Sequence, residues 1–305
     1  MLELISHLLH MLLSLFALSD QEHITPDHPL QHSIPGGVVI LDAGDQEQRP
    51  QATFRGKPVM LLPPNENRDQ WKAVIGIPLS AKPGDHQALI NGKTHTFTIK
   101  SHPYKEQRLT VKRKHVNLSD EALKRVRAEK KDMLAAFRNF EQTETWQPMA
   151  WPLKGILTSP FGLQRYFNGQ KRNPHSGLDI AANTGTPIVA PSDGKVTLTG
   201  DFYFNGNTVF MDHGEGLISM FCHMDSIEVK EGDVLTAGDR LGTVGATGRV
   251  TGPHLHWTVS LNDARINPLL ILSPHPGVVS KALLTSAARE DKATNGVVQT
   301  AVSAD

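Results

Sequence analysis

The sequence predicts an all-β protein in which two β-rich regions are joined by a single helix. Residues 34–110 and 151–272 both consist of short apolar runs separated by clusters of Gly, Pro and Asn, which is the spacing of sheets rather than of alternating strands and helices. A helical periodicity appears in the segment between them. With 305 residues, of which 39% are hydrophobic and 20% charged, the chain is long enough to bury two cores.

The first segment, residues 1–19, is predicted to be a signal peptide. Its apolar stretch, residues 8–18, is shorter than the ~20 residues of a membrane-spanning helix, and residues 17–19 form a small-x-small cleavage site. The segment carries Glu3 and lacks the Lys or Arg of a typical signal, so an amphipathic N-terminal helix is the alternative. We expect an exported protein with no membrane span after cleavage.

Residues 34–116 are predicted to form an N-terminal β-sandwich. Apolar runs such as residues 71–77 are bounded by turn residues. Asn91-Gly92 is a strong hairpin signal, because it separates an apolar run from residues 93–99, which alternate with a period of two.

A helical linker is predicted over residues 117–150. Ser119 can cap the helix, and Asp120 and Glu121 suit the positive end of the helix dipole. One face is rich in basic residues, which we interpret as a solvated surface; a grip on an anionic polymer is the alternative. These residues are Lys124, Arg125, Arg127, Lys130 and Lys131.

Residues 151–272 are predicted to form the second β-domain, followed by a mostly disordered tail over residues 273–305 that is rich in Ser, Ala and Thr. The 31 Lys and Arg residues balance the 31 Asp and Glu residues, which argues against nucleic-acid binding. The single cysteine excludes an internal disulfide. We expect Cys222 in the core, alternating away from His223, and His213 bonded to backbone.

Three motifs of the second domain carry candidate chemistry. His175 and Asp179 are ligand types that zinc accepts, although this spacing alone arises easily by chance. Residues two apart on a strand face the same way, so His254 and His256 are expected to project toward one point. His223 lies at a strand end that is expected to belong to the same sheet.

Together these motifs resemble the lysostaphin-like (LytM-type) zinc metallopeptidases, which cut peptidoglycan cross-links. The resemblance covers the whole second domain. More loosely, residues 76–84 and 107–111 are similar to the β-sandwich domain that precedes the peptidase domain in some Gram-negative members. The matching segments of the second domain are residues 159–162, 175–179, 187–191, 193–196, 212–214, 221–223, 231–233, 242–245, 248–257 and 267–268.

The resemblance implies a role for each candidate residue. His175, Asp179 and His256 are implied to bind one zinc ion and to leave its fourth position to water, while His223 and His254 form a catalytic pair whose division of roles stays open. Tyr166 is a candidate oxyanion donor, and Asn168 and Arg249 are candidate groove residues. Two segments, residues 164–169 and 221–222, depart from the family pattern; neither contains a ligand, and both concern how the groove grips its peptide.

The sequence therefore predicts a zinc endopeptidase that hydrolyses peptide cross-links of bacterial peptidoglycan. The resemblance of the first domain implies a Gram-negative periplasm and a D-alanine to diaminopimelate bond. The expected partners are peptidoglycan stem peptides and a regulatory protein or adaptor. One alternative is a non-catalytic LytM-type module that binds or activates a cell-wall amidase; another is a β-protein with an incidental metal site. Whether the first domain covers the groove stays open.

Overall fold

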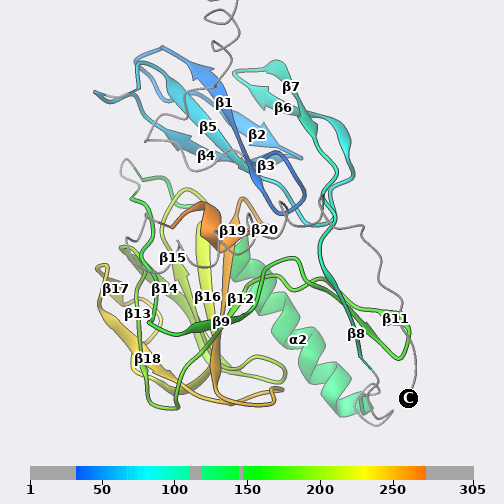
Figure 1. Cartoon of the computed structure of the whole chain (residues 1–305). Helices are drawn as coiled ribbons and strands as arrows, with labels where there is room; N and C mark the ends of the chain where they lie inside the picture. Colours follow the sequence, from blue (N-terminus) through cyan, green and yellow to red (C-terminus); the bar gives the residue numbers. More distant parts are fainter. Residues whose placement is uncertain (1–31, 67, 110–117, 144–146, 273–305) are drawn as a thin grey trace, which may run out of the picture.

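The computed structural model describes residues 32–66, 68–109, 118–143 and 147–272. Strands dominate this part of the chain, and one long helix lies between the two β-rich regions in sequence (Figure 1). The predicted all-β class with a linker helix is confirmed. The predicted signal segment (1–19) and tail (273–305) lie outside the described residues.

The N-terminal region, here residues 32–99, contains two small sheets packed around a shared core of Val39, Phe54, Ile75 and Phe97. The hairpin predicted at Asn91-Gly92 is present, and both residues have positive φ, as a tight turn of this kind requires. One sheet has the order β1 (Val38–Gly44), β5 (Trp71–Gly76), β4 (Met60–Leu62), and the other β3 (Lys57–Pro58), β2 (Ala52–Phe54), β6 (Gly84–Ile90), β7 (Lys93–Ile99).

The C-terminal region, here residues 147–272, is built on a ten-stranded sheet. Its core includes the fully buried Trp257 and Phe221, which lie opposite each other on paired strands. Seven strands form the path β17 (Val234–Leu235), β14 (Gly194–Phe202), β15 (Gly206–Asp212), β16 (Leu217–Ile227), β19 (His254–Leu261), β12 (Leu178–Ala181), β9 (Ile156–Ser159), joined by β13 (Pro187–Val189), β18 (Arg240–Val244) and β20 (Ala264–Ile266), and the 3₁₀-helix η2 (Pro268–Leu270) follows.

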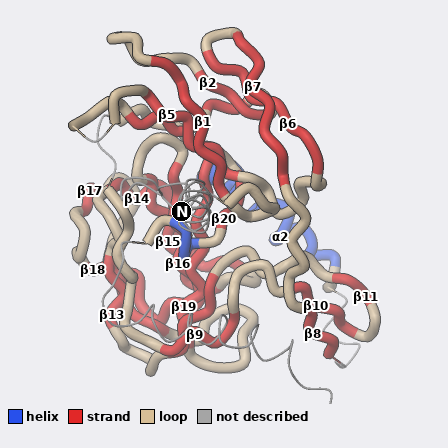
Figure 2. Tube along the Cα trace, turned by 45° about the horizontal axis from the view of Figure 1, so that its top comes forward, coloured by secondary structure: helices blue, strands red, loops and turns tan. Residues whose placement is uncertain are grey.

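A separate three-stranded sheet links distant parts of the chain. It has the order β11 (Gln170–Lys171), β10 (Gln164–Phe167), β8 (Glu106–Leu109), and β8 runs parallel to β10 (Figure 2). Residues 106–109 lie within the segment predicted as the β-sandwich, yet they pair with a strand of the C-terminal region. The segment that follows the N-terminal sheets therefore lies beside β10 as an added strand.

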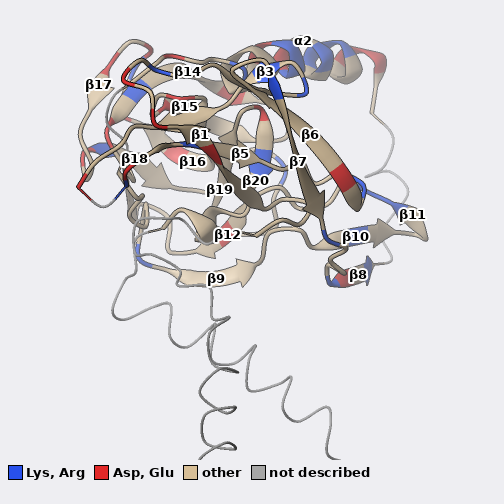
Figure 3. Ribbon diagram, turned by 90° about the horizontal axis from the view of Figure 1, so that it is seen from above, with Lys and Arg blue, Asp and Glu red and all other residues tan. Residues whose placement is uncertain are grey.

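Helix α2 (Asp120–Phe137) covers one face of the ten-stranded sheet. Ser119 caps it as predicted, accepting a hydrogen bond from the Ala122 N–H. Its buried end, at Phe137, packs with Phe210 and Cys222 of the sheet. Of the predicted basic face, Arg125 pairs with Glu129 and Asp201, while Lys124, Arg127, Lys130 and Lys131 are exposed. Figure 3 shows the Lys and Arg positions along α2 in blue. Among the described helices, none is both long and apolar enough to cross a bilayer.

The two β-rich regions share one continuous apolar core. Val38, Met60, Leu62 and Val74 of the N-terminal region belong to the same cluster as Leu217, Val259, Leu261 and Ile266. The Asn262 amide also exchanges two hydrogen bonds with the Gly76 backbone, at 2.7 and 3.2 Å. These contacts gather at the C-terminal end of β19. The β1-β5-β4 sheet is thus packed against one end of the main sheet.

A buried carboxylate completes this interface. Glu215 is 1% exposed and accepts hydrogen bonds from the Leu61 N–H at 3.0 Å and the Thr143 N–H at 2.9 Å, and it pairs with Arg49. It therefore joins the N-terminal sheets, the segment after α2 and the main sheet at one point.

Candidate metal centre

Three side chains that are distant in sequence converge at the start of β19. Asp179 of β12 lies directly opposite His256 of β19 in an antiparallel pair, so both side chains emerge from the same face. His175, which precedes β12, is held by backbone hydrogen bonds to residues 162 and 163. The Nε2 atom of His175 lies 2.9 Å from Asp179 Oδ1 and 3.0 Å from His256 Nδ1, and the last two atoms are 2.8 Å apart.

This donor set fits a zinc ion. Two imidazole nitrogens and one carboxylate oxygen are ordinary zinc ligands, and bonds of about 2.0–2.2 Å in a tetrahedron place the donors about 3.3 Å apart. The observed separations of 2.8–3.0 Å are a few tenths of an ångström shorter, so small outward shifts accommodate the ion. Three protein donors leave one tetrahedral position open, as hydrolytic sites require. The three residues predicted as ligands are thus brought together.

Hydrogen bonds outside the cluster orient the imidazoles. His175 donates from Nδ1 to the Pro160 carbonyl at 2.9 Å, so the lone pair lies on Nε2, which faces the cluster. Nε2 of His256 contacts the Thr258 hydroxyl at 2.9 Å, which leaves Nδ1 to face the other donors. Burial lowers the pKa of His256 and so favours its neutral form. Burial alone would raise the pKa of Asp179, but the two imidazoles beside Oδ1 outweigh this effect and hold that pKa below its usual value.

His223 and His254 lie side by side at the edge of this cluster. Their ring centres are 4.9 Å apart, and His254 Nε2 is 3.8 Å from Asp179 Oδ1. Each ring donates from Nδ1 to a carbonyl oxygen, His223 to Thr247 at 3.0 Å and His254 to Gly252 at 2.9 Å. In the neutral form of each ring, Nε2 is therefore the atom that carries the lone pair. Burial, reinforced by the neighbouring imidazoles, lowers the pKa of His223 to about 4, so it is a neutral proton acceptor at pH 7.

His223 reaches the cluster through an irregularity in β16. Cys222 is paired with His256 and lies on the same sheet face, buried under α2, so regular alternation would turn His223 to the other face. His223 instead has φ of +64°, in the left-handed region, and its N–H donates to the Asn205 carbonyl. Cys222 is buried as predicted, and burial raises the pKa of its thiol to about 12. The sequence predicted that simple alternation turns Cys222 and His223 to opposite faces. The left-handed backbone at His223 breaks that alternation at this strand end.

The carbonyls that hold His223 come from two loops in close contact. A Cβ added at Gly248 would lie 2.4 Å from the Gly206 nitrogen, so the two backbones approach as only glycine permits. Arg249 follows on the same loop; its N–H donates to the Phe204 carbonyl and its guanidinium lies 5.7 Å from the Phe204 ring centre. Arg249, a candidate groove residue, therefore lies beside the two loops whose carbonyls hold His223.

Tyr166 and Asn168 lie on the β10–β11 hairpin. The Tyr166 hydroxyl donates to Glu106 at 3.1 Å, and the Arg108 guanidinium lies 4.1 Å from its ring centre. Asn168 has φ of +51°, and its N–H donates to the Leu109 carbonyl. These contacts lead to β8 rather than to the donor cluster, so the substrate roles of both residues stay predictions.

Arg165 is a neighbour of the cluster that the sequence did not single out. Its Nη2 lies 3.9 Å from Asp179 Oδ2 and donates to the Ser159 hydroxyl at 2.9 Å. Its Nε donates to Gln107 Oε1 of β8 at 3.2 Å. The only signal in the sequence was the departure from the family pattern at residues 164–169.

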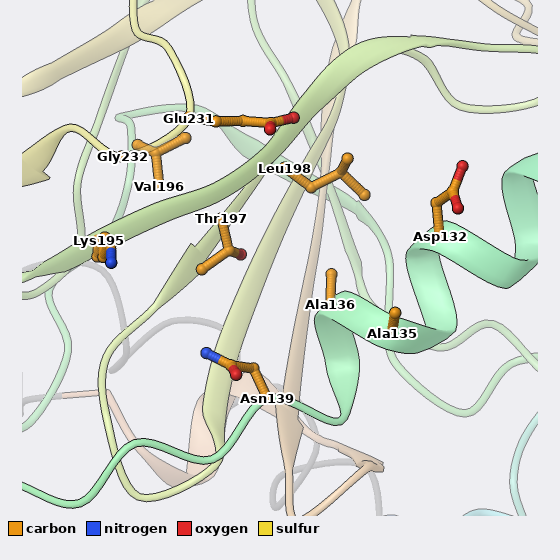
Figure 4. Close-up of a pocket in the computed structure, with 10 residues that line it drawn as sticks. All are labelled: Asp132, Ala135, Ala136, Asn139, Lys195, Val196, Thr197, Leu198, Glu231 and Gly232. Atoms are coloured by element: carbon orange, nitrogen blue, oxygen red, sulfur yellow. The ribbon is translucent and has the colours of Figure 1, made fainter.

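Two further features lie apart from the cluster. His213 donates to the Asp193 carbonyl and contacts the Ser219 hydroxyl, which confirms that it bonds backbone; burial lowers its pKa to about 4. A cavity of about 490 Å³ lies between α2 and β14 (Figure 4). Its lining residues, which include Asp132, Thr197 and Glu231, contain none of the clustered histidines.

Comparison with known proteins agrees with this geometry. A model of peptidase family M23 matches residues 173–268, and a model of the peptidase family M23 N-terminal domain matches residues 31–102. The chain is 35% identical over 137 residues to the DD-carboxypeptidase/endopeptidase Mpg of Neisseria meningitidis serogroup B, which covers 45% of this chain and 32% of the relative. It is 37% identical over 131 residues to the peptidoglycan DD-endopeptidase ShyC of Vibrio cholerae, with coverages of 40% and 30%.

These alignments span about a third of the length of the curated relatives. Among solved structures, a crystal structure described as a putative peptidase M23 from Pseudomonas aeruginosa is 42% identical, with a TM-score of 0.68, and the match covers 81% of this chain and 97% of that one. The resemblance inferred from the motifs is confirmed. The chain belongs to peptidase family M23.

Proposed function

We propose that this protein is a zinc-dependent endopeptidase that hydrolyses peptide cross-links of bacterial peptidoglycan. One observation carries the proposal: three donors of His175, Asp179 and His256 lie within 3.0 Å of one another, beside two imidazoles whose Nε2 atoms are proton acceptors. A zinc ion there supplies Lewis-acid polarisation of a carbonyl and lowers the pKa of a coordinated water to about 7.

The two remaining histidines supply the proton transfers. Peptide hydrolysis needs one group to take a proton from the attacking water and another to protonate the leaving amine or to stabilise the tetrahedral intermediate. His223 and His254 are fixed in the tautomer that accepts a proton at Nε2. Either can serve as the base, so the division between them is left to experiment.

The substrate follows from the family and its relatives. Relatives named as peptidoglycan DD-endopeptidases support the D-alanine to diaminopimelate cross-link, and therefore action in the periplasm of a Gram-negative bacterium after export directed by residues 1–19. Stem peptides are then the principal partner, with Tyr166, Asn168 and Arg249 as groove contacts. The second candidate, a module that activates an amidase without catalysis, is disfavoured because all five histidine and aspartate positions are retained.

The test combines zinc content with muropeptide release from purified sacculi. We expect about one zinc per wild-type chain and shortened cross-linked dimers; His256→Ala should lose metal, and His254→Ala should keep metal without activity. His95→Ala, on β7 in the N-terminal region, is the matched control and should behave as wild type. A wild-type protein that holds no zinc and releases nothing would favour the amidase-activating module.

A further inference from the structure

We propose that Arg165 is a positioning residue that orients the carboxylate of Asp179 toward the metal, and that strand β8 holds Arg165 in place. The inference rests on the proposed zinc site. It adds a residue outside the donor cluster and connects that cluster to a strand that precedes α2 in the sequence.

The two oxygens of Asp179 have different surroundings. Oδ1 lies within 2.9 Å of both His175 Nε2 and His256 Nδ1, where the metal donors meet. Oδ2 faces the Arg165 guanidinium at 3.9 Å. The side chains of Asp179 and Arg165 are 13% and 32% exposed, so water screens this attraction only in part. A fixed cation beside Oδ2 favours the rotamer in which Oδ1 alone points to the donor cluster.

Arg165 is itself fixed from two sides. Its Nη2 donates to the Ser159 hydroxyl at 2.9 Å, and Ser159 is paired with Asp179 across β9 and β12. Its Nε donates to Gln107 at 3.2 Å, and these two residues are partners in the parallel register of β10 and β8. The guanidinium is therefore anchored by a strand next to Asp179 and by a strand that precedes α2.

Alternation along β10 separates this role from that of the next residue. Arg165 turns toward Ser159 and Asp179, whereas Tyr166 contacts Glu106 and Arg108 of β8. Arg108 carries the same charge as Arg165 on the paired strand, but its contacts are with Glu106 and Tyr166. The pair Arg165 and Arg108 thus offers a matched comparison of charge with and without contact to Asp179.

The decisive measurement is the zinc affinity of the metal-stripped full chain, by competition with a chromophoric chelator. Loss of a residue that orients a metal ligand typically weakens binding by about 10–100-fold, and we expect a loss of that size for Arg165→Gln. Arg165→Lys should recover part of it, because an ammonium keeps the charge and lacks the fork that reaches both Ser159 and Gln107. Arg108→Gln removes the same charge and should stay within about twofold of wild type.

Gln107→Ala provides a second test at an exposed position where unfolding is not expected. It should weaken zinc binding by a smaller factor than Arg165→Gln, with unchanged circular dichroism. Arg165→Gln that binds zinc as tightly as wild type, or more tightly because a repelling cation is gone, would overturn the inference. Wild-type protein that binds no zinc would overturn the proposed function as well, so the two failures are distinguished by the wild type alone.

Discussion

Replacing Glu215 by Ala should lower the free energy of unfolding by about 4 kcal/mol, because a buried junction loses its acceptor. The carboxylate is 1% exposed and takes the N–H groups of Leu61 and Thr143. A buried N–H without an acceptor costs about 1–3 kcal/mol. The pair with Arg49, whose side chain is 25% exposed, is partly screened by water and adds about 1 kcal/mol.

Urea unfolding of the full chain, followed by circular dichroism, measures this loss. With a slope of about 3 kcal/mol per molar urea, the midpoint should fall by about 1.3 M. Glu215→Gln retains one acceptor oxygen, so its urea midpoint should lie between those of wild type and Glu215→Ala. Glu228→Ala removes an exposed carboxylate paired with Arg240 at 2.8 Å and should cost less than about 1 kcal/mol. The reasoning is refuted if Glu215→Ala and Glu228→Ala shift the midpoint equally.

Three further substitutions probe the site and its surroundings. In Gly177→Ala the new Cβ would lie 2.5 Å from the Trp257 carbonyl oxygen, and zinc affinity measured by equilibrium dialysis should fall by about tenfold or more; unchanged affinity would contradict this packing argument. Gly248→Ala, at φ of +75°, should displace the loop that supports His223 and lower kcat by about tenfold with zinc content retained, whereas a joint loss of zinc and activity would mean that the whole site has moved. Because burial lowers the pKa of folded His213 to about 4, the unfolded chain binds the proton first as pH falls below 6.5, so this contribution to stability is present above 6.5 and is lost toward pH 4. Wild type should lose about 2 kcal/mol more than His213→Gln between pH 7 and pH 5, and parallel stability curves would exclude the effect.

The sequence was sufficient where chemistry follows local geometry. The two-residue spacing of His254 and His256 on a strand predicted their common direction, and both face the cluster. The cap at Ser119 and the turn at Asn91-Gly92 followed from the preferences of those residues.

Two features of the site could not be predicted in this way. The left-handed backbone at His223 could not be predicted from a glycine, because the residue there is histidine. This conformation depends on two loops that meet only in the folded chain. Arg165 and Gln107 are partners in a parallel register across 58 positions of sequence, which no periodicity reveals. In both cases tertiary contacts override the local pattern.

The shared core of the two β-rich regions has a consequence for the order of events during synthesis. Val38 and Val74 are covered by residues as late as Ile266, so about 190 residues must follow Val74 before this apolar face can be buried. At a typical synthesis rate of roughly 5–20 residues per second, that face stays exposed for about 10–40 s. The nascent chain thus exposes an apolar surface before the strands of the candidate metal centre exist, and a holding chaperone that shields this surface during that interval should raise the yield of folded protein.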